Sequence, residues 1–272
     1  MSEVERYYDR QVEHEWSRLE RHPIEFGVTL RALEDYLPRP PAAILDVGGG
    51  PGRYSIALAA RGYVVTLVDL SANCIAFARR KAEELEIQLA GSVRASAVDL
   101  GAFTDASFDA VLLMGPLYHL VRAEDRARAV AEARRVLKPE GLLFASFIGR
   151  YAAIIADAAR RYPERILTSR ARWERELETG VVEISFSAAP VTFTEAYMVR
   201  PQEVRPWLEG AGFATLDLIG CEGLLGQVEE GIKQLADEAR AAWIDLTYRV
   251  GKDPSVHGAA CHLLYVGRKQ PD

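Results

Sequence analysis

The sequence has little cysteine and no long apolar run. Only three of its 272 residues are cysteine, Cys74, Cys221 and Cys261. An odd number at wide spacing excludes a disulfide framework and does not match a zinc site, so we expect reduced, buried thiols. No segment reaches the about 18 apolar residues of a membrane-spanning helix, and the acidic, polar N-terminus does not resemble a signal peptide. These absences predict a soluble, cytoplasmic protein.

Basic residues are also not in excess. The chain has 33 Lys and Arg against 39 Asp and Glu, a net charge of −6. A protein that binds nucleic acid or an anionic membrane mainly through charge needs a basic surplus. We therefore expect neither partner. The length suits one large α/β domain with an elaboration, or two small domains, and no internal repeat is present.

Glycine, in contrast, is concentrated in one short stretch. The apolar run Ile44–Val47 contains Asp46 and is followed by Gly48, Gly49, Gly50 and Gly52, ahead of a helix-like pattern. This order predicts a strand that turns into a helix. Glycine allows a ligand to approach the main chain, and the N-terminus of the helix favours negative charge.

The spacing of these glycines separates the nucleotide-binding folds. The dinucleotide fingerprint G-x-G-x-x-G is not met, because Arg53 stands where the third glycine belongs. This disfavours an NAD-dependent oxidoreductase. A P-loop is excluded because no Gly-Lys-Ser/Thr follows. The pattern Asp46-x-Gly48-x-Gly50-x-Gly52 resembles motif I of the class I S-adenosylmethionine (SAM) dependent methyltransferases.

Three further segments carry the same resemblance. The apolar segment 64–70 holds Asp69 near its end, at the distance from the glycines where Rossmann-like sites place a ribose-binding acid. The segment 107–111 (SFDAV) resembles the family's entry to strand four, and 136–141 (VLKPEG) resembles its "R-V-L-K-P-G-G" turn. The resemblance spans 42–148. It implies a Rossmann-like, mostly parallel seven-stranded α/β sheet with an antiparallel last strand and helices on both faces.

The resemblance also implies cofactor roles. The motif I glycines should cradle the methionine and ribose of SAM, with S-adenosylhomocysteine as product; Asp46 should order the loop, and Asp69 should bind the ribose. Asp99 lies at the end of the segment 93–100, which we expect to contain the third strand. The resemblance implies that Asp99 binds adenine; the alternative is that it is only a turn residue. The expected cofactor contacts are Asp46, Gly48, Gly49, Gly50, Gly52, Tyr54, Asp69, Leu70, Asp99, Leu100 and Met114.

The loop after strand four, 114–120 (MGPLYHL), should face the reactive methyl group. It lacks the Asn/Asp-Pro-Pro-aromatic motif of methylases that modify base amino groups, and the carboxylates that hold Mg²⁺ in catechol methylases. The paired glutamates of arginine methylases are also missing. Because the carboxylates that would hold Mg²⁺ are absent, we expect no metal. His119 is then the candidate general base and Tyr118 the residue that orients the acceptor. Either side chain could instead only pack.

Segments outside 42–148 predict a cover over the site. The pattern of residues 2–22 predicts one amphipathic helix. Its Tyr8 and Trp16 are candidate acceptor contacts, because aromatic faces attract a cationic sulfonium, and so is Arg18 in its charged row. The alternative is a packed helix pair with a solvated charged row. We divide the chain into a helical cap (1–41), the SAM-binding core (42–148), an insertion (149–200) and the C-terminal part of the sheet (201–272) with a helix at about 224–250. The insertion either covers the acceptor or forms an oligomer interface.

The sequence therefore predicts a SAM-dependent methyltransferase of a small molecule, with an O, N, S or C acceptor atom and a monomeric or homodimeric state. Two alternatives stay open. One is a methylase of RNA or protein, although the acidic charge weighs against RNA. The other is a SAM-binding scaffold protein that binds the cofactor without turnover.

Overall fold

The chain folds around one sheet of nine strands in the computed structural model, which describes residues 2–159, 166–182 and 194–271. The sheet order is β3-β2-β1-β4-β5-β7-β6, and β9 pairs with both β5 and β8. The strands are β1 (Ala43–Val47), β2 (Val64–Asp69), β3 (Gly91–Arg94), β4 (Phe108–Leu113), β5 (Leu137–Gly149), β6 (Val181–Val182), β7 (Ala196–Val199), β8 (Phe213–Gly220) and β9 (His262–Lys269). The predicted Rossmann-like architecture is confirmed, with two more strands than expected.

The additional strands are β6 and β7, and they lie above the end of β4. Strand β4 pairs with β5 up to Leu113, opposite Ala145. Strand β9 holds the other edge of β5 as far as Ile148, in antiparallel register. Strand β7 pairs with Ile148 and Gly149 in parallel, so it continues the edge that β4 leaves. The insertion after β5 thereby folds back over the carboxyl end of the parallel strands, where α/β folds bind their ligands.

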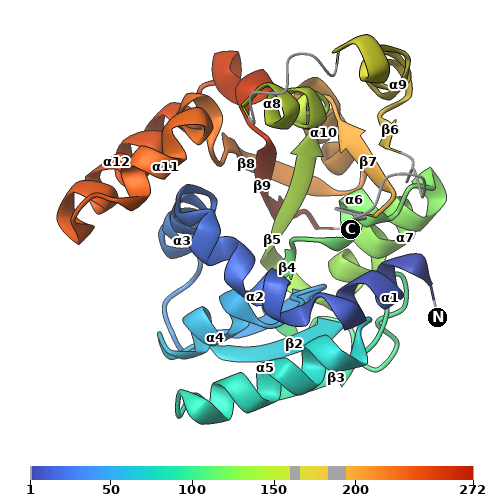
Figure 1. Ribbon diagram of the computed structural model, residues 1–272. Helices are drawn as coiled ribbons and strands as arrows, with labels where there is room; N and C mark the ends of the chain where they lie inside the picture. The colour runs from blue at the N-terminus through green and yellow to red at the C-terminus, as the bar shows by residue number, and fades with distance from the viewer. Residues whose placement is uncertain (1, 160–165, 183–193, 272) are drawn as a thin grey trace.

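Helices cover both faces of the sheet (Figure 1). Alternate strand residues point to opposite faces, and apolar residues on both sides make these strands nearly continuous hydrophobic runs. On one face α7 (Ala123–Val136) and α10 (Pro201–Gly210) pack against Leu45, Val111, Leu143 and their neighbours. On the other, α3 (Pro23–Tyr36), α4 (Arg53–Ala59) and α12 (Asp237–Gly251) pack around Ile44, Leu112, Phe144 and Leu264. Helix α5 (Ala72–Glu84) packs beside α4 and against β2.

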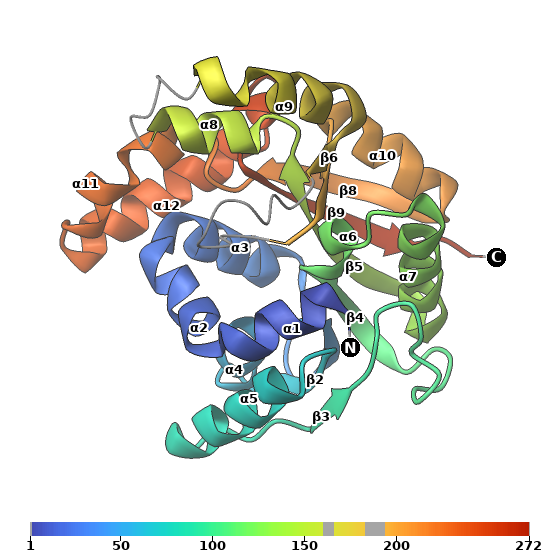
Figure 2. The ribbon, with the colours of Figure 1, turned by 45° about the vertical axis from the view of Figure 1, so that its right-hand side comes forward.

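The N-terminal segment forms two helices and not the single helix predicted for 2–22. They are α1 (Glu3–Arg10) and α2 (Val12–Arg21), which meet at Gln11. Gln11 is neither glycine nor proline, so tertiary contacts decide the break: α1 lies against α5, whereas α2 lies against α3 as well as α5 (Figure 2). The Ser2 hydroxyl and the Glu5 carboxylate form a capping box that fixes the start of α1.

Two other expected elements differ in the structure. The third strand ends at Arg94, because the Asp99 N–H donates to the Ser96 carbonyl (3.0 Å) and closes a turn. The helix predicted near 224–250 is three pieces, η2 (Gly223–Val228), α11 (Glu229–Lys233) and α12. Extended backbone at Ala236 (φ −58°, ψ 154°) separates α11 from α12.

The sequence after β5 predicts helix at 151–179 and extended structure at 181–199, and the residues that the structure describes in these ranges agree. This segment contains α8 (Ala152–Ala159), α9 (Ile166–Thr179) and the β6–β7 pair. Residues 183–193 of the predicted extended segment lie outside the described residues. The short helices α6 (Pro116–His119) and η3 (Pro254–Ala259) complete the chain. Among the described residues, no helix is both long and apolar enough to cross a membrane.

Candidate active site

The glycine-rich turn connects β1 to α4 at the carboxyl end of the sheet. Gly48, Gly50 and Gly52 have φ of 71°, 55° and 86°, a region that other residues rarely adopt. A Cβ atom on Gly50 would meet no protein atom within 4 Å, whereas one on Gly48 would lie 2.5 Å from the Pro116 side chain. The main chain at Gly50 therefore offers room for a ligand, as the SAM prediction requires.

Two buried carboxylates support this turn. Asp46 accepts a hydrogen bond from the Ser55 hydroxyl (2.6 Å). Asp69, at the end of β2, accepts from the N–H groups of Gly50 and Ser71, both at 2.8 Å. Burial raises the pKa of each carboxyl to about 6. Asp46 makes the contacts of a loop-ordering residue, and Asp69 ties the strand end to the turn. Their roles toward the cofactor stay predictions.

The candidates after β3 lie differently from their expected positions. Asp99 is exposed, and its carboxylate accepts from the Gly101 N–H (3.1 Å) within its own loop. Leu100 is fully buried in the hydrophobic core. Adenine recognition by Asp99 is not tested by these contacts, but the carboxylate belongs to a turn and not to a strand end.

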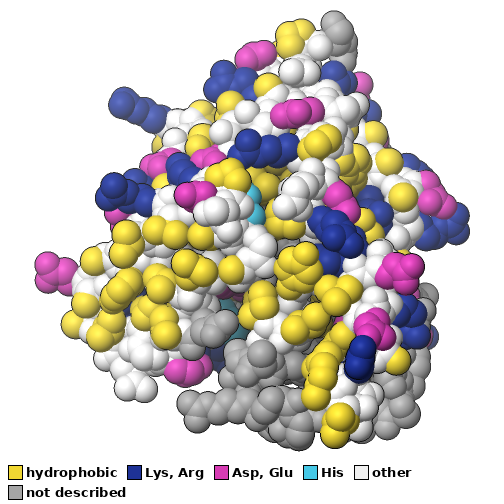
Figure 3. All heavy atoms as spheres, turned by 90° about the horizontal axis from the view of Figure 1, so that it is seen from above, with side chains coloured by type: hydrophobic (Ala, Val, Ile, Leu, Met, Phe, Trp, Pro, Cys, Tyr) yellow, Lys and Arg dark blue, Asp and Glu magenta, His cyan; other side chains and the backbone are white. Residues whose placement is uncertain are grey.

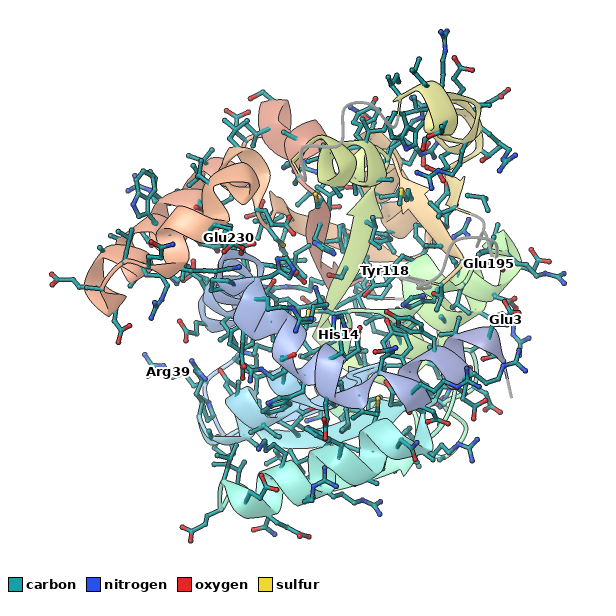
Figure 4. All side chains as sticks on the ribbon, in the orientation of Figure 1. Glu3, His14, Arg39, Tyr118, Glu195 and Glu230 are labelled. Carbon is teal, nitrogen blue, oxygen red and sulfur yellow. The ribbon has the colours of Figure 1, made fainter. Side chains whose placement is uncertain are left out.

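Helix α6 places His119 beyond the end of β4, between two segments that lie outside the core. Its Nε2 lies 2.7 Å from the Tyr8 hydroxyl of α1, and its Nδ1 lies 2.8 Å from Thr194 Oγ1. Tyr118 and Glu195, the neighbours of His119 and Thr194, are labelled in this region in Figure 4. The structure thus brings together His119 and Tyr8, which were predicted for separate roles.

These contacts specify the tautomer of His119. The Thr194 hydroxyl donates its one proton to the Glu195 carbonyl (3.1 Å), so it accepts from Nδ1–H. The lone pair is then on Nε2, and the Tyr8 O–H donates to it. Burial raises the pKa of Tyr8 well above its ordinary value, which keeps this proton in place. Burial lowers the pKa of His119 to about 4, so the imidazole is neutral at pH 7.

Comparison with known proteins identifies the family. Residues 45–145 match the family model "Methyltransferase domain". A ubiquinone biosynthesis O-methyltransferase of Xylella fastidiosa (strain 9a5c) is 32% identical over 195 residues, 71% of this chain and 69% of that protein. This chain is a class I SAM-dependent methyltransferase. The corresponding protein of Coxiella burnetii (strain RSA 331 / Henzerling II) is 28% identical over 195 residues, 71% of this chain and 72% of that protein.

A solved structure shows that the methyltransferase fold extends over most of the chain. A SAM-dependent methyltransferase from Methanosarcina mazei superposes with a TM-score of 0.61 at 20% sequence identity. The match covers 89% of this chain and 98% of the other. The family model and the relative from Xylella fastidiosa confirm the prediction of a SAM-dependent methyltransferase, which was made from the motifs in 42–148.

Tyr118 packs beside His119 (ring centroids 4.6 Å apart), whereas Trp16 and Arg18 of the methyltransferase have other direct partners. Trp16 packs against Phe77 of α5 (ring centroids 5.5 Å apart), and the Arg53 guanidinium lies over its ring at 4.5 Å. Trp16 and Phe77 line a shallow surface groove of about 320 Å³ between α2 and α5. Arg18 donates two hydrogen bonds to Glu25, at 2.7 and 3.0 Å. Contact of Trp16 and Arg18 with an acceptor stays a prediction.

Arg18 belongs to a buried charge network that the sequence did not reveal. His262, the first residue of β9, donates to Glu222 and lies 3.6 Å from Glu25. Burial favours a neutral Glu25, but Arg18 and His262 outweigh it and lower its pKa to about 2. Burial likewise favours a neutral His262, but Glu25 and Glu222 raise its pKa to about 9. Glu25, Glu222 and His262 have ligand atoms within 4.8 Å of one another, yet here two cations already balance the two carboxylates.

The pKa values of the two histidines should be shifted in opposite directions. We expect His119 to stay neutral with its proton on Nδ1 down to about pH 5.5, and His262 to stay protonated up to about pH 8, because their pKa values are about 4 and about 9. Ring ¹⁵N chemical shifts across this range, assigned with His119→Gln and His262→Gln variants, measure both. A midpoint near 6.5 for His119 would contradict the buried, hydrogen-bonded geometry.

Proposed function

We propose that this methyltransferase methylates a hydroxyl oxygen of a small aromatic molecule, with His119 as the general base. The small-molecule prediction agrees with the relatives, which are O-methyltransferases of ubiquinone biosynthesis. The single observation that carries the proposal is the neutral imidazole of His119, whose Nδ1–H is held by Thr194 and whose Nε2 lone pair accepts a hydroxyl proton from Tyr8. An amine acceptor that is already deprotonated needs no such base.

The chemistry of the acceptor explains why this imidazole is useful. SAM, when bound, supplies a methyl group on a sulfonium, and the open main chain at Gly50 with Asp69 beside it would hold it. An acceptor hydroxyl that takes the place of the Tyr8 O–H would donate its proton to Nε2. A hydroxyl oxygen that gains a carbon becomes a far stronger acid than imidazolium, so the low pKa of His119 does not prevent proton transfer.

The segments around His119 would supply positioning and exclude water. Helix α1 brings Tyr8 to one ring nitrogen, and the residues before β7 bring Thr194 to the other. We therefore assign to the cap and to the insertion after β5 the role of fixing the position of His119. Proton transfer and methyl transfer both depend on fixed distances and on the exclusion of water.

The test compares acceptor atoms on one ring system. We expect the purified enzyme, given methyl-labelled SAM, to label a catechol and not the matched anilines or thiophenols, with the label in a methyl ether by mass spectrometry. Cell RNA and protein serve as further acceptors in parallel. Labelling of the amine or of a macromolecule would overturn the hydroxyl assignment. SAM binding in calorimetry without any turnover would favour the scaffold alternative.

A further inference from the structure

Helix α12 has one buried face and one apolar face that nothing in the described structure covers. On the inner face, Tyr248 is buried and donates to Asp35 of α3 (2.8 Å), and Ile244 packs against Gly27. The outer face carries Ala239, Trp243, Leu246 and Val250. We call these four residues the α12 stripe. Its large side chains are between 39% and 45% exposed, and Leu235, which is 37% exposed, lies beyond the extended Ala236 that precedes the helix.

The α12 stripe projects from the body of the molecule. In Figure 1 α12 lies at the edge of the molecule beyond α3, and its inner side also contacts β8 of the sheet. Viewed from above, hydrophobic side chains gather on that side of the surface (Figure 3). Leu224 and Val228 of the adjoining η2 are 61% and 53% exposed and extend the apolar surface. A contiguous apolar surface of this kind on a folded protein marks an interaction site.

The stripe has the spacing of a self-complementary surface. Measured from Trp243, apolar residues occur four positions earlier (Ala239) and three and seven positions later (Leu246, Val250). When two copies of the helix lie antiparallel and are centred on Trp243, Leu246 of one copy therefore lies within the rise of about one residue of Ala239 of the other. A two-fold pair of helices requires this property, because the same patch must fit itself.

The charges beside the stripe have the same symmetry. Glu238 and Arg249 flank one side of it, near opposite ends of α12. Both are exposed, and neither has an ion-pair partner within the described part of the chain. Antiparallel pairing about Trp243 places Glu238 of one copy beside Arg249 of the other, twice. It also opposes the two helix dipoles.

We propose that α12 is a homodimer interface in which the stripes of two copies pack antiparallel across a two-fold axis. The helix has 15 residues and is about 22 Å long. A single helix pair of this length, with η2 at its ends, buries less than the roughly 1,200 Å² total that marks stable assemblies. The dimer should therefore be reversible, with a dissociation constant in the micromolar range.

Sedimentation velocity from low to several hundred micromolar protein tests the interface. We expect Leu246→Glu to abolish dimerisation. Glu238→Arg and Arg249→Glu should each weaken it about tenfold or more, because each places like charges together twice. The double variant Glu238→Arg/Arg249→Glu should restore dimerisation, since it exchanges the two signs. Glu83→Arg on α5, also exposed and without an ion pair, controls for the change in net charge. Thermal unfolding confirms that each variant is folded.

Three results would overturn the proposal. Wild-type protein that stays monomeric at several hundred micromolar excludes self-association through the stripe and leaves a different protein as its occupant. A dimer that survives Leu246→Glu places the interface elsewhere. Failure of the double variant to recover would exclude the antiparallel register. None of these outcomes depends on methyl transfer, so they are independent of the acceptor proposed above.

Discussion

Replacing His119 with alanine is expected to lower kcat by about 10²–10⁴-fold, the usual contribution of a general base. Affinity for SAM should stay unchanged, because His119 contacts Tyr8 and Thr194 and not the glycine-rich turn. Steady-state kinetics with a hydroxyl acceptor, together with calorimetry of SAM binding, separate the two effects. His14→Ala is the matched control, since His14 is an exposed histidine on α2.

The same experiment distinguishes a base from a packing residue. Thr194→Val removes the acceptor for Nδ1–H at almost constant volume and should lower kcat, whereas Thr194→Ser should retain it. If His119 acts only by packing, His119→Gln would keep wild-type kcat, and neither Thr194 variant would differ from the other. With the base intact, the acid limb of kcat/KM should lie well below pH 6, because burial depresses the pKa of His119 to about 4.

Replacing Glu25 with alanine is expected to lower the free energy of unfolding by about 3 kcal/mol, the lower end of the cost of breaking a buried ion pair. Glu25 is buried, and its loss leaves Glu15, at 3.6 Å, as the ion-pair partner of Arg18 among the residues that the structure describes. Urea unfolding measures the change. Glu20→Ala is the control, because Glu20 also pairs with an arginine (Arg53, 2.9 Å) but is 56% exposed. It should cost less than about 1 kcal/mol. Equal costs would show that the buried network does not stabilise the fold.

The network also predicts how stability depends on pH. His262 has a raised pKa, so its contribution is complete below about pH 6.5 and is lost as the pH rises through about 9. Glu25 has a lowered pKa, so its contribution is complete above about pH 4.5 and is lost as the pH falls toward about 2. Wild-type protein should therefore lose stability between pH 7 and 9, and Glu25→Ala should lose less over the same range.

The core could be predicted from the sequence because its signals are local. The glycine spacing, the acid at the end of the next strand and the serine that follows it, Ser71, which the sequence predicts as the N-cap of the next helix, each act within a few residues. The structure shows Ser71 accepting from the Cys74 N–H (3.0 Å) as an N-cap does. The third strand was predicted too long, because the turn at Ser96 depends on main-chain hydrogen bonds that apolar alternation does not reveal.

The rest could not be predicted, because it depends on pairs that are distant in the sequence. Tyr8 meets His119, and His262 lies beside Glu25 only after β9 has paired with β5 and α3 has packed on the sheet. Each side chain alone has no pattern that indicates its partner. Glu222 and Thr194 were missed for the same reason. The position of His119 in the loop after strand four was the one local signal for the candidate base.

The contacts of the two ring nitrogens of His119 bear on how the substrate of the enzyme could be changed. The core provides the ring, but one ring nitrogen is served by a residue before motif I and the other by a residue from the segment after β5. Those two segments can exchange residues without changing the glycine-rich turn or the acid of β2. On the function proposed above, the fold therefore places the binding of the methyl donor and the contacts with the acceptor on different segments of the chain.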